Sequence, residues 1–240
     1  MLGLPMYQLL FLFSLFASSC ASSGTPFQLE TFGEMRQVLR EGHTEGRVSL
    51  TEMTTAGTWG LGALAGLEGE ITILDGDVFL EIIVDGRLER RAVEESDQAA
   101  LLVSAWVPEW REVPLGAIAS LRELEKAMGE ALDTAGFDPA RTPVPIRIEG
   151  EFSNIALHVL DHSCPIANPD GPPPIRWEGS DVRASIVGIY AVGFGGKLTH
   201  HGQTSHLHVV ARLEVGDSVS GHLEQIAFVG RASLLIPLSH

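Results

Sequence analysis

The chain has 240 residues, of which 45% are hydrophobic, so it is long enough to bury a substantial core in one domain or two small ones. Acidic residues outnumber basic residues 31 to 16, and the formal net charge is −15. Such a charge repels phosphate backbones and no cluster of lysine and arginine offsets it, so we expect no nucleic-acid partner.

The N-terminal segment 1–20 has the form of a secretory signal. Residues 1–16 carry no charged side chain, and an apolar run over 9–16 leads into small residues around Cys20. The segment is too short to span a bilayer as a stable transmembrane helix. Cys20 lies where a bacterial lipobox places its acylated cysteine, so we expect an exported protein, either periplasmic or anchored to the membrane through a lipid on Cys20. An ordinary signal peptide cleaved nearby is the alternative.

Two helices are predicted in the first half of the chain. Apolar residues recur at helical spacing over 29–40, and Gly42 ends this helix. A second helical pattern covers 115–132, with Gly136 just beyond its end. Between them, the glycine-rich stretch 57–69 does not follow the strand-to-helix pattern of a nucleotide-binding loop. Its glycines are expected to permit bends and a close approach of backbones.

Strands are predicted from apolar runs bounded by turn signals. Asp-Gly pairs at 75–76 and 85–86 separate such runs and indicate β-hairpins. The strands expected in the first half cover residues 70–74, 78–83, 87–93, 99–107 and 144–148. Four strands with short turns, typical of an antiparallel sheet or barrel, are expected in the second half over residues 185–192, 204–213, 221–229 and 233–236.

A proline-rich loop over 162–176 divides the chain into halves of unlike character. The predicted fold class is therefore α+β, with a mixed β-sheet module and its helices packed beside a largely antiparallel β module. We expect the N-terminal module to cover 27–160 and the C-terminal module to cover 175–240. Cys164 lies in the loop among prolines, away from any obvious base, and is interpreted as a structural or incidental thiol.

Histidines gather near the C-terminus. Five of them, His200, His201, His206, His208 and His222, occur within 23 positions. His206 and His208 point to the same face of a predicted strand, because residues i and i+2 do so. His222 follows a short turn that can bring it beside that strand. Three imidazoles so placed can hold a divalent transition metal and leave a position open for substrate. The alternative is a set of partly exposed polar residues.

Four segments of the chain resemble the α-acetolactate decarboxylase family, and together they span about residues 27–237. They are the glycine segment 57–70, the Ile-Glu-Gly-Glu-Phe run 148–152, the Val-Gly-Ile-Tyr run 187–190 with the following Gly195 and Gly196, and the histidine segment 199–222. Their order and spacing match the family throughout, and the histidine segment is the most specific of the four.

The resemblance implies a zinc enzyme that converts 2-acetolactate, a small hydroxy-keto acid, to acetoin and carbon dioxide. It also implies two packed β-rich modules and a homodimer. The positions that match the family's zinc ligands are His206, His208 and His222. Glu70 matches a glutamate placed at the active site, where a carboxylic acid can deliver a proton as a general acid. Its place in the sequence alone is more typical of a solvated carboxylate at the end of a strand.

The chain departs from the family at two positions that concern the substrate. Family members have a threonine where Ala63 stands, and an arginine at the position that matches His158. An arginine pairs with a carboxylate bidentately at any pH, whereas histidine does so only when protonated. We expect His158 to belong to the catalytic site, with Arg147, Arg176 or Arg183 as alternative sources of positive charge. Many members also bring a second glutamate to the metal from a C-terminal tail, which we do not expect here.

Two alternatives to acetolactate decarboxylation stay open. The changes at Ala63 and His158 favour a divergent exported metalloenzyme of the same scaffold, acting on another α-hydroxy-β-keto acid or on a lactone. The exported location favours a non-catalytic metal-binding lipoprotein, since acetolactate is made in the cytoplasm. The metal is also open, because three imidazoles suit copper, nickel, cobalt or iron as well as zinc.

Overall fold

A computed structural model describes residues 26–164, 168–213, 216–230 and 232–238. The described residues form two antiparallel sheets with few helices, so the predicted α+β class is confirmed. The signal segment predicted for 1–20, with Cys20, lies outside the described residues. Within them, neither helix has the length and the apolar content needed to cross a bilayer.

The first sheet contains the strands that lie before residue 107. Its order is β1-β7-β3-β4-β5-β6, and the short β2 pairs with β7 as well. Its members are β1 (Gln28–Phe32), β2 (Val48–Ser49), β3 (Thr58–Leu64), β4 (Gly69–Leu74), β5 (Asp77–Val84), β6 (Arg87–Arg91) and β7 (Gln98–Trp106). Short 3-10 turns, η1 (Leu50–Met53) and η2 (Ala65–Leu67), precede β3 and β4.

Both predicted Asp-Gly hairpins are present in this sheet. Asp75 and Gly76 join β4 to β5 with φ angles of 55° and 84°. Asp85 and Gly86 join β5 to β6 in the same way, with φ angles of 50° and 73°. Positive φ at both turn residues matches the right-handed twist of the flanking strands, which is why Asp-Gly is favoured there.

The second sheet contains every strand after residue 107, in the order β11-β10-β14-β13-β12-β9-β15-β8. Its members are β8 (Trp110–Leu115), β9 (Val144–Phe152), β10 (Asn154–Val159), β11 (Ile175–Gly179), β12 (Val182–Tyr190), β13 (Ser205–Arg212), β14 (Ser218–Ala227) and β15 (Ala232–Pro237). The chain therefore passes from the first sheet to the second between β7 and β8, and not at the proline-rich loop. The predicted modules 27–160 and 175–240 do not coincide with the sheets, and a division of the chain into two modules at these bounds stays a prediction.

The two helices are shorter than their sequence patterns indicated. The helix α1 covers Met35–Glu41, and the predicted helix over 29–40 is wrong in its first half, because β1 pairs there with β7. The helix α2 covers Leu121–Thr134 and begins at a cap in which the Ser120 hydroxyl accepts a hydrogen bond from the Glu123 amide at 3.3 Å. Its predicted start at residue 115 is wrong, because β8 pairs with β15 up to Leu115.

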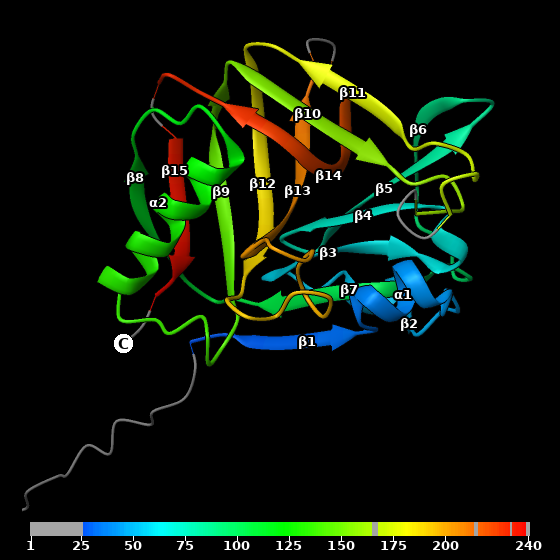
Figure 1. Cartoon of the computed structure of the whole chain (residues 1–240), viewed down its shortest axis with the longest axis horizontal. Coiled ribbons are helices and arrows are strands. Elements are labelled where there is room, and N and C mark those ends of the chain that lie inside the picture. Colours follow the sequence, from blue (N-terminus) through cyan, green and yellow to red (C-terminus); the bar gives the residue numbers. More distant parts are fainter. Residues whose placement is uncertain (1–25, 165–167, 214–215, 231, 239–240) are drawn as a thin grey trace, which may run out of the picture.

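The two sheets pack face to face, and their strands cross at a large angle in Figure 1. One apolar cluster spans the interface and contains Trp59 and Ala105 of the first sheet together with Ile146, Ile186 and Val209 of the second. The helix α2 lies beside β8, β9 and β15, whereas α1 lies against the first sheet, near β7 (Figure 1). This packing brings β4 over β13 and β14, the strands that carry the three predicted metal ligands.

Candidate metal centre and its cavity

Three histidines converge where β13 and β14 pair. His208 on β13 lies directly opposite His222 on β14, and His206 lies two residues earlier on the same face of β13. One ligand nitrogen from each of His206, His208 and His222 can be chosen so that all lie within 4.8 Å of one another. The structure thus brings together the three residues that the sequence singled out.

The strand β4 contacts both ring nitrogens of His208. The Glu70 Oε2 atom lies 3.5 Å from Nε2 of His208, and the Thr72 hydroxyl lies 3.3 Å from its Nδ1. Glu70 and Thr72 are two residues apart, so both side chains leave β4 toward the second sheet. In the tautomer in which Nδ1 donates to Thr72, Nε2 keeps its lone pair free for a metal. Partners of this kind orient ligand imidazoles in metalloproteins.

Burial determines the protonation of these groups. It lowers the pKa of His206 and of His222 well below the ordinary value, and that of His208 to about 3, so all three imidazoles are neutral near pH 7. Burial has the opposite effect on Glu70, since it raises the pKa of the carboxyl group well above 4.5, against a hydrogen bond from the Leu160 amide. Glu70 is only 3% exposed, so its carboxyl group keeps its proton to a higher pH than an exposed glutamate does.

A fourth imidazole lies in the same row of the sheet. His158 on β10 is the direct cross-strand partner of His222, and their ring centroids are 4.8 Å apart. Its Nδ1 atom lies 3.0 Å from Oε1 of Glu224. Burial lowers the pKa of His158, although Glu224 opposes this shift. His158 is therefore a neutral hydrogen-bonding group beside the metal ligands.

Glu224 also holds Arg176, and no sequence pattern had singled out this glutamate. Arg176 donates from Nε at 2.8 Å and from its terminal nitrogen at 3.1 Å to the two carboxylate oxygens. The register of β14 against β10 skips Glu224, which makes it the extra residue of a β-bulge. Glu224 lies two residues after His222 on β14, and alternation puts both side chains on the same face. The spacing His-x-Glu was the available signal.

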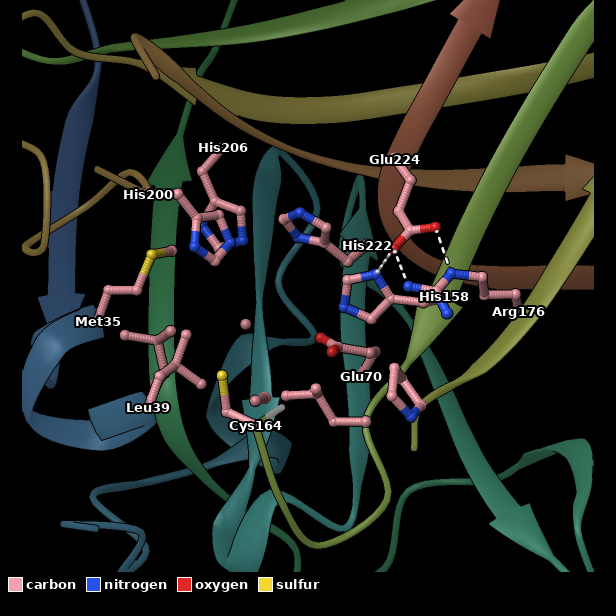
Figure 2. Close-up of a pocket in the computed structure, with 15 residues that line it drawn as sticks. Met35, Leu39, Glu70, His158, Cys164, Arg176, His200, His206, His222 and Glu224 are labelled. Carbon is pink, nitrogen blue, oxygen red and sulfur yellow. Dashed lines mark hydrogen bonds and ion pairs between the residues drawn. The ribbon is translucent and has the colours of Figure 1, made fainter. Parts of the chain in front are cut away.

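These residues surround one cavity of about 230 Å³, which we call the main cavity. Figure 2 shows His200, His206 and His222 on one side of it, with Glu70 and His158 close by. Of the three arginines considered as sources of charge, Arg176 lines it. The opposite wall is apolar and is formed by Met35, Leu39, Ala63, Leu101 and Leu160.

Two further residues, His200 and Cys164, also line the main cavity, and their sequence context did not indicate this. The ring centroid of His200 lies 5.1 Å from that of His222 and 5.9 Å from that of His206. Cys164, interpreted as an incidental thiol, is buried and lines the main cavity. The loop that contains it returns to the first sheet through a hydrogen bond from the His162 amide to the Leu67 carbonyl.

The residues present fit a divalent transition metal. Three neutral imidazoles are the donor set that zinc, copper, nickel and cobalt accept. The Nδ1 atom of His206 is buried and has no hydrogen-bond partner among the residues that the structure describes, which is unusual for a buried polar atom unless it has another ligand. The Glu70 carboxyl group lies beside this donor set, with its Oε2 atom 3.5 Å from Nε2 of His208.

A family model described as alpha-acetolactate decarboxylase matches residues 32–236. The chain belongs to this family. Among solved structures, alpha-acetolactate decarboxylase from Bacillus subtilis strain 168 is similar, with a TM-score of 0.66 and 19% identity over 88% of this chain and 86% of that one. A Staphylococcus aureus protein of unknown function, titled as similar to alpha-acetolactate decarboxylase, has a TM-score of 0.65 and 15% identity over 87% and 84%. No curated protein matches the chain.

Both substrate-facing departures from the acetolactate decarboxylase family pattern lie in the main cavity. Ala63 on β3 is the cross-strand partner of Glu70 and lines the cavity, as does His158. The glycine beside it also has a structural reason, because a Cβ at Gly62 would overlap the Leu101 carbonyl on β7. Gly62 therefore permits the close pairing of β3 with β7. The pairing of β3 with β4 on its other edge places Ala63 beside Glu70.

Proposed function

We propose that this chain is a zinc-dependent decarboxylase that converts 2-acetolactate to acetoin and carbon dioxide. The observation that carries the proposal is the convergence of Glu70 and three buried imidazoles, of which His206 and His222 line the main cavity, in a chain of the acetolactate decarboxylase family. His206, His208 and His222 would hold the zinc ion. When bound, the ion supplies Lewis-acid stabilisation for negative charge on neighbouring hydroxyl and ketone oxygens.

Glu70 has the properties of the proton donor. Loss of carbon dioxide breaks the bond between the carboxylate carbon and the hydroxyl-bearing carbon, and the electron pair moves to the ketone oxygen to form an enediolate. The protonated Glu70 carboxyl then delivers its proton to the carbon that lost carbon dioxide, which yields acetoin and a Glu70 carboxylate. A proton from solvent restores the acid. Burial raises the pKa of Glu70, which favours the protonated form that this step needs.

The apolar wall supports the loss of carbon dioxide. A carboxylate placed against Met35, Leu39 and Leu101 loses hydration, and the departing carbon dioxide is neutral and apolar. The change from a charged group to a neutral one is therefore favoured on this side of the main cavity. The polar side, with His206, His222 and Glu70, faces the oxygens on which charge develops.

A second candidate function rests on the wall formed by His158 and Arg176. Where the family resemblance implies an arginine free to hold the substrate carboxylate, His158 is neutral and bonded to Glu224. The charge of Arg176 is matched by the same glutamate. This arrangement favours a divergent enzyme that acts on a lactone, because a lactone has no carboxylate for that arginine to hold. Action on another α-hydroxy-β-keto acid stays a prediction, since such an acid carries the same carboxylate.

One experiment separates these functions. Zinc content and product formation are measured on the same preparation, with 2-acetolactate and with 2-aceto-2-hydroxybutanoate as substrates. Stoichiometric zinc with acetoin formation from 2-acetolactate is the expected result. Turnover of the second substrate alone supports the divergent enzyme, whereas bound zinc without turnover of either would sink the catalytic proposal and leave a metal-binding protein.

We further propose that the protein is exported, that Cys20 carries a lipid anchor, and that the functional form is a homodimer. The support for export is the apolar segment that ends in small residues around Cys20. The support for a dimer is membership of the family. Export would place the enzyme where it acts on acetolactate that has left the cytoplasm.

A further inference from the structure

One wall of the main cavity is formed by His158 and Arg176. Among the described residues of this wall, no cationic side chain is unpaired. The two oxygens of Glu224 accept from Arg176 at 2.8 Å and 3.1 Å, so this arginine is committed to an ion pair. The Nδ1 atom of His158 lies 3.0 Å from Oε1 of the same glutamate, so His158 is engaged there too. The side chains of this wall therefore offer an entering carboxylate no unpaired cation, and the protein as a whole, with a net charge of −15, repels anions.

A second cavity of about 240 Å³ adjoins the first, and we call it the side cavity. It shares Met35, Leu39, Cys164 and His200 with the main cavity. The residues that belong to it alone are Arg36, Arg40, Gly196, His201 and Gln203. The two cavities therefore meet at His200, which has one ring contact with each of His206 and His222.

The side cavity is built by α1 and the loop over 193–203. The Met35 amide donates to the Lys197 carbonyl at 2.9 Å, and the Arg36 amide donates to the Gly196 carbonyl at 2.7 Å. Arg36 and Arg40 are one helical turn apart, so both side chains leave α1 on the face that borders this loop. The loop and the helix thus hold a cationic rim in a defined place.

The charges around the side cavity leave Arg40 available. Arg36 is paired with Glu41 at 3.3 Å, and Lys197 lies 4.0 Å from Glu34. Among the residues that the structure describes, no hydrogen bond or ion pair engages the Arg40 guanidinium. Arg40 and His200 both line the side cavity.

We propose that the side cavity is the access subsite for the anionic substrate, and that Arg40 captures the carboxylate of a small hydroxy acid before it passes His200 into the main cavity. The inference rests on the proposed function for the identity of the substrate. The physical basis is local. A cation at a cavity mouth raises the concentration of an anion there, and this effect decreases when salt screens the charge.

Binding of an unreactive carboxylate tests the subsite without catalysis. The probe is 2-hydroxy-2-methylpropanoate, which keeps the carboxylate and the tertiary hydroxyl but has no ketone, and the neutral control is its amide. Calorimetry at low salt on the zinc-loaded protein should show affinity for the carboxylate about tenfold weaker in Arg40→Gln, with Arg40→Lys near wild type. Arg122→Gln changes an exposed helical arginine on α2 and should have no effect. Equal affinity in wild type and Arg40→Gln, or an equal loss for the amide, would overturn the proposal.

Kinetics then test the role of the subsite in access. In Arg40→Gln, kcat/KM for 2-acetolactate should decrease about tenfold at low salt, and the difference should vanish near 0.5 M salt, at roughly a 4 Å screening length. The value of kcat should change little, since the chemistry takes place in the main cavity. A decrease confined to kcat would contradict capture at Arg40. The protein could bind the unreactive carboxylate in an Arg40-dependent way and yet make no acetoin. That result would refute decarboxylation but support the subsite.

Discussion

Glu70 on β4 and His208 on β13 belong to different sheets, yet their Oε2 and Nε2 atoms lie 3.5 Å apart. A protonated carboxyl group and a neutral imidazole can share this short distance without the repulsion or the ion pairing that charged forms would bring. The contact exists because the sheets pack face to face, with β4 over β13. It places the Glu70 carboxyl group, the proposed proton donor, beside the candidate metal, and several predictions depend on it.

The first prediction concerns His208 as a metal ligand. Substitution of His208 by alanine leaves two imidazoles, which should reduce zinc content from near one per chain to under about a tenth and abolish acetoin formation. Elemental analysis of the purified variant measures this. His43→Ala, which removes an exposed histidine far along the sequence from the site, is the matched control and should keep its zinc. Full zinc occupancy in His208→Ala would remove this residue from the ligand set.

Thr72 should act as a positioning residue for the metal. Thr72→Val keeps the shape of the side chain but removes the hydroxyl that lies 3.3 Å from Nδ1 of His208. Loss of such a partner costs about 10–100-fold in metal affinity. Competition with a zinc chelator measures the affinity, and Thr72→Ser should restore it. An unchanged affinity in Thr72→Val would mean that His208 is oriented by packing alone.

Glu70→Gln should separate proton transfer from metal binding. The amide cannot donate an acidic proton, so kcat should decrease by about 10²–10⁴-fold. Zinc content should remain near that of the wild type, because the three imidazoles are unchanged. Glu68→Gln, at an exposed position two residues earlier, is the control and should keep full activity. Wild-type turnover in Glu70→Gln would assign the proton to another group.

Glu81 should make the stability of the protein depend on pH. This carboxyl group on β5 is 2% exposed and accepts a hydrogen bond from the Ser220 amide at 3.1 Å. Burial raises its pKa from 4.5 to about 7, although Ser220 opposes the shift. Between these two values the folded state keeps a proton that the unfolded chain has released, so stability falls as pH rises through this window.

Glu81→Gln should abolish this part of the pH dependence. The amide still accepts from Ser220 but has no charge to bury, so its stability relative to wild type should increase by about 3 kcal/mol between pH 4.5 and pH 8. Urea unfolding across this range measures the difference. Glu89→Gln, an exposed position on β6, should follow the wild-type curve. Parallel curves for wild type and Glu81→Gln would show that the carboxyl is ionised in the folded state.

The proposed lipid anchor leads to a prediction on location. Cys20→Ser removes the thiol that would be acylated, so the protein should move from the membrane fraction to the soluble exported fraction, and labelling with a fatty-acid analogue should be lost. Cys164→Ser changes the other cysteine of the chain and should leave both readouts unchanged. A wild-type protein that remains in the cytoplasmic fraction would contradict export itself.

The local features of the fold were readable from the sequence where a short-range signal determines them. Asp75-Gly76 and Asp85-Gly86 form the predicted hairpins because both residues tolerate positive φ. The helix predicted over 29–40 failed in its first half, because β1 gains hydrogen bonds from β7, about 70 residues away in the chain. Apolar spacing alone carries no information about such a partner.

The sequence by itself determined which residues hold the candidate metal. His206 and His208 share a strand face because side chains alternate with a period of two, and the turn before His222 returns it to the same face. Only the tertiary structure decided what surrounds them. The packing of β4 over β13 buries Glu70 and changes its protonation, and the bulge at Glu224 removes the charge of Arg176 from the main cavity. Burial and pairing across strands depend on the whole chain, and they convert a set of histidines into a site with an acid and an apolar wall.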